Sequence, residues 1–256
     1  MPKDNVEFLA YGCSKKDLEA ACSRLTKKGF GVAGIIVEPL QGRGGVVLPP
    51  KGWLQTLREV ATAVKGLLIF DEIFTGLGRT GSLLASSQVQ GDLVCLGKAL
   101  GGGMPISACI GTNEVFASWP ICRGEALHTG TFFGHGLSCS VGLLTLELLC
   151  KENLPERSCH LGLEAKEYLE KKLATHPLVK QIRGKGLMLA VEFKKDNIGA
   201  KLMGALRKKG VVVLPSGPRA QVLSLTPALN IPKNLLFRSI DLIAQTLTEE
   251  FFGDMQ

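Results

Sequence analysis

Three short apolar runs constrain the fold of this 256-residue chain more than any other feature. They cover residues 32–38, 67–71 and 93–96, and segments with helical periodicity precede the first two. Short continuous apolar runs that alternate with helices are typical of parallel strands covered on both faces. The pattern therefore predicts an α/β protein with a parallel sheet.

Charged residues stand at the carboxyl ends of these three runs. Glu38 and Asp71 end the first two, and Lys98 follows the third after a single glycine. Parallel open sheets bind their ligands outside the carboxyl ends of the strands. We therefore expect Glu38, Asp71 and Lys98 to converge on one crevice.

The pair formed by Lys98 and Asp71 indicates a pyridoxal 5′-phosphate (PLP) site. A lysine ahead of a glycine cluster, here residues 101–103, can form an imine with an aldehyde cofactor. An aspartate at the neighbouring strand end can hold a pyridine nitrogen protonated. Taken singly, Asp71 is better explained as a helix cap or an ion-pair acid, and Lys98 as a solvated loop lysine. Their joint placement favours the cofactor.

Residues 76–81 match the G-x-G-x-x-G pattern of dinucleotide-binding proteins. In those proteins the glycines follow a strand directly and open a helix, and the next strand ends in an acidic residue. Here residues 72–75 intervene, and no strand with such an acidic end follows at the required spacing. We therefore do not expect a nicotinamide or flavin cofactor.

Composition limits which binding partners and which cellular compartment are expected for this chain. The net charge is +7, but the lysines and arginines are scattered and not interleaved with aromatic residues, so no nucleic acid is expected. The eight cysteines form no CxxC pair, which is typical of reduced thiols in a cytoplasmic protein, and no metal site is predicted. No apolar stretch approaches the roughly 18 residues that span a bilayer, and the start is polar, so neither a membrane segment nor a signal peptide is expected.

A second region begins near Pro155 and alternates helical and strand patterns. Helices are predicted at 156–174, 199–209 and 232–252, and strands at 179–183, 187–193, 211–214 and 222–225. This mixture predicts a small α+β domain. We therefore divide the chain into residues 1–154 and 155–256.

Several motifs resemble those of the class-III PLP-dependent aminotransferases, which include the ornithine, acetylornithine and 4-aminobutyrate aminotransferases. The main matches are FDEIFTGLGRTG at 70–81 and GKALGGG at 97–103, and collinear matches lie at 37–42, 128–134, 183–187 and 225–229. The resemblance implies the α/β fold of the fold-type I PLP-dependent transferases, with an incomplete large domain that contains a mixed, mostly parallel sheet and a small α+β domain. Residues 1–154 are then part of the large PLP-binding domain, and residues 155–256 are the small carboxyl-terminal domain.

The resemblance also implies a role for each matching residue. Lys98 is the lysine that forms the Schiff base, and Asp71 is the partner of the pyridine nitrogen. Ile73 packs on one face of the ring, and Glu38 orders the site near it. Thr131 reaches the cofactor phosphate of the neighbouring subunit, since family members are dimers that share active sites.

Two positions depart from the ornithine-type pattern. Phe74 stands where those relatives have a glutamine that touches the phenolic oxygen of the cofactor, and phenylalanine donates no hydrogen bond. Arg43 stands where they have a glutamate, and the arginine that pairs with that glutamate aligns with Ser224. Arg43 either binds a substrate carboxylate through its two-pronged donors or lies at the surface.

The predicted function is transfer of an amino group from an amine or amino acid to a 2-oxo acid through a Schiff base on Lys98. Family members are usually longer, and their amino-terminal part holds the cofactor phosphate in a cradle of backbone N–H groups. We expect this chain to be the carboxyl-terminal portion, with weak PLP binding and impaired activity alone. The alternatives are a non-catalytic chain that pairs with a full-length subunit, or a PLP enzyme of another type, such as an aminomutase or decarboxylase.

Overall fold

The computed structural model describes residues 5–120, 124 and 128–251. The chain forms two compact units, each built from separate segments. Unit 1 comprises residues 1–39, 49–74 and 86–146, and unit 2 comprises residues 40–48, 75–85 and 147–256. The division at residues 154 and 155 stays a proposal, and the units differ from it because residues 40–48 and 75–85 group with the carboxyl-terminal segment.

A four-stranded mixed sheet forms the centre of unit 1, in the order β1-β2-β3-β4. Strands β1, β2 and β3 are parallel, and β4 is antiparallel to β3. The strands are β1 (Gly34–Val37), β2 (Leu67–Asp71), β3 (Leu93–Leu96) and β4 (Ala108–Gly111). The helices are α1 (Lys15–Lys27), α2 (Trp53–Ala63), the 3₁₀ helix η2 (Lys98–Gly101), α3 (Asn113–Ala117) and α4 (Gly136–Lys151), whose last turn belongs to unit 2.

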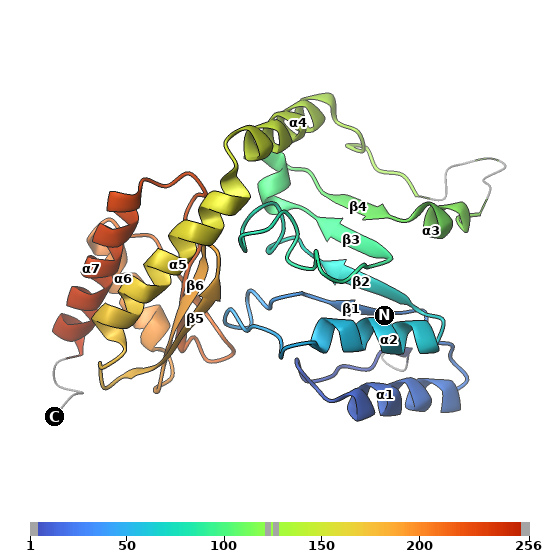
Figure 1. Cartoon of the computed structure of the whole chain (residues 1–256), viewed down its shortest axis with the longest axis horizontal. Helices are drawn as coiled ribbons and strands as arrows, with labels where there is room; N and C mark the ends of the chain where they lie inside the picture. Colours follow the sequence, from blue (N-terminus) through green and yellow to red (C-terminus); the bar gives the residue numbers. More distant parts are fainter. Residues whose placement is uncertain (1–4, 121–123, 125–127, 252–256) are drawn as a thin grey trace. The chain divides into compact units, whose positions relative to one another are not determined.

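Helices α1 and α2 lie on one side of this sheet (Figure 1). A capping box begins α1, because Ser14 accepts a hydrogen bond from the N–H of Asp17 and the Asp17 carboxylate accepts one from the N–H of Ser14. The apolar face of α2 covers the strands, and Phe70 of β2 is 0% exposed. Burial of a side chain of this size stabilises the fold by about 1.5–3 kcal/mol. The buried core of unit 1 consists of Leu18, Val37, Trp53, Leu57, Val60, Ala61, Leu68 and Phe70.

The other face of the sheet is less covered. Ile36 on β1 is 71% exposed, and its register partner Ile69 is half-buried. Two positions along from Ile69, Asp71 pairs with Cys95, and Cys95 pairs with Cys109. Residues in register on neighbouring strands point to the same face. Asp71, Cys95 and Cys109 therefore form a row across three strands of this face.

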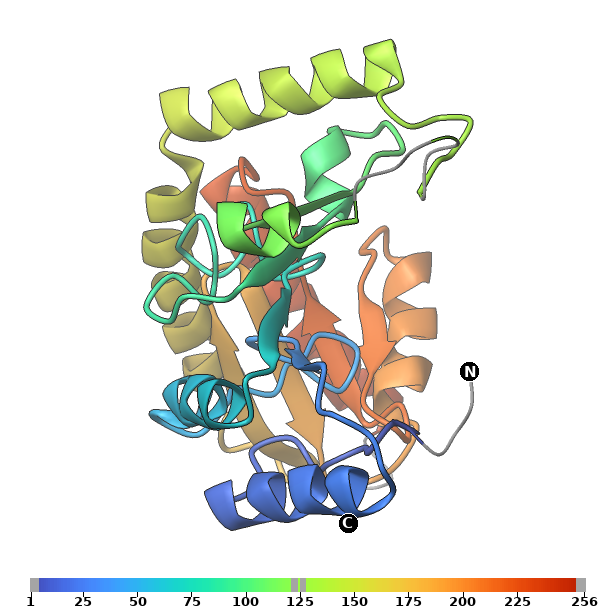
Figure 2. The ribbon, with the colours of Figure 1, turned by 90° about the vertical axis from the view of Figure 1, so that its right-hand side faces the viewer.

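Unit 2 contains a four-stranded antiparallel sheet in the order β5-β6-β8-β7. Its strands are β5 (Val179–Lys185), β6 (Met188–Phe193), β7 (Leu214–Ser216) and β8 (Val222–Leu225). The helices are α5 (Leu154–Leu173), α6 (Ile198–Lys208) and α7 (Lys233–Glu250). They pack with the sheet around one apolar core, and α6 runs alongside the strands (Figures 1 and 2).

One strand of unit 2 begins later in the chain than the sequence predicted. Residues 211–213 precede β7, which begins at Leu214. The N–H of Val211 donates to the carbonyl of Leu206, and Gly210 has a φ of +79°, so these residues still close the end of α6. Among the described helices, none is long and apolar enough to cross a membrane.

Candidate active site

The turn that follows β2 fixes the carboxylate of Asp71. The half-buried Asp71 ends the strand, and its Oδ1 accepts a hydrogen bond from the N–H of Ile73 at 3.1 Å. The next residue, Glu72, is 1% exposed, and its Oε1 accepts a hydrogen bond from the N–H of Ser86 at 2.8 Å. Both interactions hold the turn in one conformation, so the orientation of Asp71 is set by its own backbone neighbours.

Lys98 begins η2 and stands in an unusual backbone conformation. Its φ is +43°, in the left-handed region, which costs about 1–2 kcal/mol for a residue with a Cβ. Such strain often marks a residue whose position serves function. The side chain is exposed, and its Nζ lies 5.1 Å from the ring centroid of Phe74, where a cation–π interaction forms. Phe74 comes from the turn that also carries Asp71.

Two adjacent parallel strands bring these residues to one end of the sheet. Asp71 of β2 pairs with Cys95 of β3, and Gly97 and Lys98 follow β3 directly. The side chain of Ile73 packs against Gly97, because a Cβ at Gly97 would lie 3.3 Å from Cγ2 of Ile73. Asp71, Ile73 and Lys98 therefore meet at the carboxyl ends of β2 and β3.

Glu38 occupies the equivalent end of β1, which pairs with β2. Val37 is the register partner of Phe70, so Glu38 directly follows the paired residues. Glu38 is half-buried, and its carbonyl accepts a hydrogen bond from the hydroxyl of Tyr11 at 3.1 Å. The sequence predicted the convergence of these three strand ends, and the role of Glu38 near a cofactor ring stays a prediction.

Thr131 and Arg43 lie outside this group of strand ends. Thr131 is exposed in the turn before α4, where the N–H of Phe133 donates to the carbonyl of Gly130 at 3.0 Å. Arg43 is an exposed residue of unit 2, and its carbonyl accepts a hydrogen bond from the N–H of Gly217 at 3.0 Å. The roles of both side chains stay predictions.

Sequence reasoning gave no role to Glu72 or Gly97. Glu72 is a positioning residue for the turn of Asp71, and Gly97 leaves room for Ile73. The sequence did contain a signal for Glu72, which is a second carboxylate directly after an apolar strand. A carboxylate buried at such a place needs a hydrogen-bond partner, because burial without one is costly. The need for a small residue at position 97 depends on packing between two turns, which the sequence does not display.

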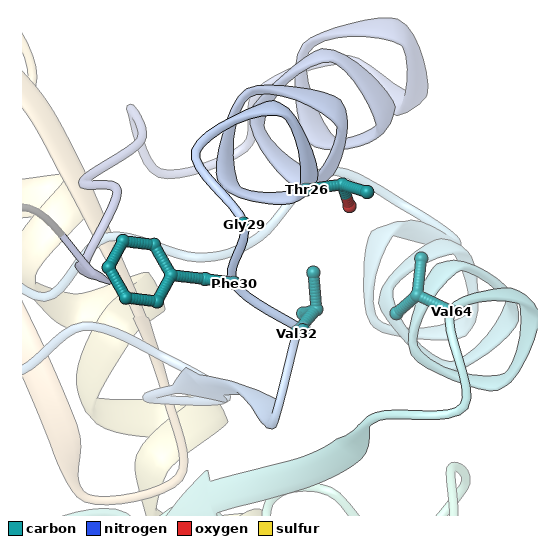
Figure 3. Close-up of a pocket in the computed structure, with 6 residues that line it drawn as sticks. Thr26, Gly29, Phe30, Val32 and Val64 are labelled. Atoms are coloured by element: carbon teal, nitrogen blue, oxygen red, sulfur yellow. The ribbon is translucent and has the colours of Figure 1, made fainter.

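A separate hollow of about 410 Å³ lies near the end of α1 (Figure 3). Figure 3 shows Val32 and Val64 on opposite sides of it, with Phe30 pointing away from Val64. Its lining residues are Thr26, Gly29, Phe30, Gly31, Val32 and Val64. None of them has an ionisable side chain, so this hollow offers no acid–base chemistry. Within the described residues, no cluster of His, Cys, Asp or Glu is suited to hold a metal ion.

Comparison with known proteins identifies the family. Residues 4–247 match the family model described as aminotransferase class-III. The chain belongs to this family. Class-III aminotransferases depend on PLP, which agrees with the chemistry predicted from the sequence.

Solved structures of class-III aminotransferases resemble this chain closely. The ornithine aminotransferase of Plasmodium yoelii is 32% identical with a TM-score of 0.85, and the match covers 96% of this chain and 63% of that one. The acetylornithine aminotransferase of Elizabethkingia anophelis is 33% identical with a TM-score of 0.83, covering 94% and 59%. An ornithine aminotransferase of Toxoplasma gondii, described with partial occupancy of PLP at its active site, is 34% identical with a TM-score of 0.84, covering 95% and 55%. The chain thus spans less than two thirds of the length of these relatives.

The residues at the strand ends suit the ring of PLP. An amine and a carboxylate come from the ends of adjacent strands, as an aldehyde and a pyridine nitrogen on one ring require. The apolar side chain of Ile73 lies between the two turns, where it offers a surface for a planar ring. Lys98, Asp71 and Ile73 are therefore the candidate cofactor residues of this chain.

Proposed function

We propose that this chain takes part in a PLP-dependent transamination that moves an amino group from an amine or amino acid to a 2-oxo acid. The observation that supports the proposal is the meeting of Lys98, Asp71 and Ile73 at the ends of two parallel strands. Membership of the class-III aminotransferases supports the reaction type. The amino donor and the 2-oxo acid are the proposed small-molecule partners.

Each of the three residues has a defined task in this proposal. Bound PLP supplies an electron sink that lowers the cost of removing a proton from the α-carbon of the substrate. Lys98 Nζ would hold the aldehyde group of PLP, and its free amine would move the proton at the substrate α-carbon as a general base and acid. The carboxylate of Asp71, oriented by the N–H of Ile73, would hold a proton on the pyridine nitrogen through its negative charge.

The remaining predicted residues complete the proposed site. Phe74 lies beside the lysine, and its ring face contacts Lys98 Nζ. Glu38 limits the site on the side of β1. Thr131 contacts the cofactor phosphate of a second subunit, so we propose a homodimer with shared active sites. We propose that Arg43 binds a substrate carboxylate.

The test uses reductive trapping. The purified chain is mixed with PLP, reduced with borohydride and digested, and the pyridoxyl-labelled peptide is identified by mass spectrometry. We expect the label on the peptide that contains Lys98, no such label in Lys98→Ala, and unchanged labelling in Lys51→Ala, which removes another exposed lysine of unit 1. Equal labelling of several lysines in the wild type would contradict a dedicated site.

Product analysis then tests the reaction class. A transaminase turns over repeatedly only when a 2-oxo acid is present, because without it each site forms at most one equivalent of product and the amino group stays on the cofactor. A decarboxylase or aminomutase turns over without this acceptor. We expect strict dependence on the acceptor. Product that exceeds one equivalent per bound PLP without the acceptor would replace transamination with one of those two reactions.

A second candidate is a non-catalytic chain that pairs with a full-length subunit. The observation that favours it is the apolar surface of α4, on which Leu137, Leu143 and Leu144 are 58%, 59% and 56% exposed. PLP labelling of Lys98 without turnover, followed by turnover when a full-length relative is added, would support this candidate.

We also propose a cytoplasmic location, because the seven described cysteines are free thiols.

A further inference from the structure

Two cysteines face one another on neighbouring strands beside the candidate site. Cys95 lies on β3 and Cys109 on β4, and the two are direct register partners in the antiparallel pair. The other described cysteines lie on helices or in loops: Cys13, Cys22, Cys139, Cys150 and Cys159. Among the described cysteines, Cys95 and Cys109 are therefore the two that a sheet holds face to face.

The register is compatible with the Cα spacing of a disulfide. Directly opposed residues of an antiparallel pair have Cα atoms about 4.5 or 5.5 Å apart, depending on the hydrogen-bonding position. Disulfides join residues whose Cα atoms are about 4.4–6.8 Å apart. Both kinds of cross-strand position fall within this range, and Cys95 and Cys109 are close enough for Cys109 to raise the pKa of the Cys95 thiol. A bond between them needs rotation of the side chains and little movement of the strands.

The two thiols differ in their surroundings. Cys109 is exposed on β4, which is an edge strand of the sheet. Cys95 is half-buried between β2 and β4. Burial raises the pKa of the Cys95 thiol most, followed by the neighbouring Cys109 and the negative charge of Asp71. An incoming reagent therefore reaches Cys109 first, and Cys95 is the second thiol to react.

We propose that Cys95 and Cys109 form a redox-active dithiol that is oxidised to a disulfide by low-molecular-weight disulfides. The Cys109 thiolate attacks one sulfur of the small disulfide, whose S–S bond breaks and releases one thiol after protonation. Cys95 then loses its proton and attacks the Cys109 sulfur, which releases the second small thiol. Two protein thiols are oxidised, and one small disulfide is reduced to two thiols.

The bond would alter the strand that leads to Lys98. Cys95 is also the register partner of Asp71, and Gly97 follows it after one residue. A disulfide at this point ties β3 to the edge strand next to the carboxylate and the lysine. The dithiol is thus a modification site distinct from the residues assigned to the cofactor.

The experiment treats the folded chain with glutathione disulfide. Remaining thiols are blocked by alkylation, and the protein is digested without reduction for mass spectrometry. We expect the Cys95–Cys109 cross-link to exceed every other cysteine pair at least about tenfold, because the sheet holds the two thiols together. The preference should disappear when the chain is unfolded in urea before oxidation.

Three variants separate the dithiol from general thiol reactivity. Cys95→Ser should leave Cys109 as a mixed disulfide with glutathione, and Cys109→Ser should abolish the cross-link. Cys150→Ser removes an exposed cysteine of α4 and should leave the cross-link unchanged. A folded wild type that carries only mixed disulfides, or a cross-link lost equally in Cys150→Ser, would overturn the proposal.

Discussion

Gly162 offers the sharpest test of the packing in unit 2. It lies in the middle of α5, where the helix crosses the turn between β5 and β6. A Cβ at this position would lie 2.7 Å from Cα of Gly186 and closer still to its carbonyl carbon and oxygen. Carbon atoms in contact prefer about 3.5–4.0 Å, so Gly162→Ala requires the helix or the turn to move by roughly 1 Å.

The expected effect of Gly162→Ala follows from two opposing contributions. Forcing one carbon against a backbone in a packed core costs about 3 kcal/mol, the upper part of the range for overpacking. Alanine is a better helix former than glycine by about 1 kcal/mol, which leaves a net loss of about 2 kcal/mol. A domain of this size loses about 2–4 °C in Tm per kcal/mol, so the transition should fall by about 4–8 °C.

Gly204→Ala in α6 is the matched control. A Cβ at Gly204 meets nothing within 4 Å, so the same chemical change adds helix propensity without a collision. We expect it to raise the free energy of unfolding by up to about 1 kcal/mol. Both variants are compared with the wild type by thermal unfolding followed through helical circular dichroism. A Gly162→Ala protein that unfolds at or above the wild-type temperature would refute the close packing of α5 on Gly186.

Four further predictions concern pH, capping, charge and hydrogen bonding. Burial lowers the pKa of His176 in the folded protein below its ordinary value of 6.5. As the pH falls below about 6.5, the unfolded protein therefore takes up a proton at His176 before the folded protein does, and the free energy of unfolding should decline. His176→Gln should flatten this part of a pH series of urea titrations, and an unchanged slope would contradict the assignment. Ser14→Ala removes the cap of α1 and should cost about 1 kcal/mol in the same titrations, whereas Ser14→Asp should cost much less. Asp71→Asn keeps an acceptor for the N–H of Ile73 but removes the negative charge. PLP affinity and turnover should therefore fall, while the free energy of unfolding changes by less than about 0.5 kcal/mol. Unaltered PLP affinity would argue against the contact with the pyridine nitrogen. Burial lowers the pKa of Arg79 to about 10, and its Nη1 donates to two backbone carbonyls. Arg79→Met should therefore lower the free energy of unfolding by about 2–3 kcal/mol, because both acceptors lose their donor. Unchanged stability would show that water replaces the guanidinium.

The ends of β2 and β3 could be predicted from the sequence because the apolar runs end at Asp71 and just before Gly97 and Lys98. The predicted runs at 67–71 and 93–96 agree with β2 and β3 to the residue, and Asp71 and Lys98 follow from their ends. Because β2 and β3 are parallel neighbours, both residues then lie at the same end of these two strands. The motifs that resemble the class-III aminotransferases led to the family that the comparison identified.

Other features could not be predicted from the apolar pattern alone. The left-handed conformation of Lys98 at a φ of +43° belongs to a residue type with no local preference for it. The register that joins Cys95 to Cys109 requires knowledge of which strands pair. Residues 211–213 have strong β propensity, yet the end of α6 takes the first N–H of this segment and delays the strand. Strand pairing therefore decides the cysteine register, whereas the delayed start of β7 comes from the local hydrogen bond that ends α6.

The discontinuous make-up of unit 2 bears on how the chain is synthesised and dissected. Segments 40–48 and 75–85 leave the ribosome long before residues 147–256, although all three belong to the same compact unit. The Nε of Arg183 donates to the carbonyls of Gly45 and Val46, so a carboxyl-terminal half expressed alone would lack acceptors that come from the other half. Cutting the gene at one point therefore cannot yield two intact folding modules.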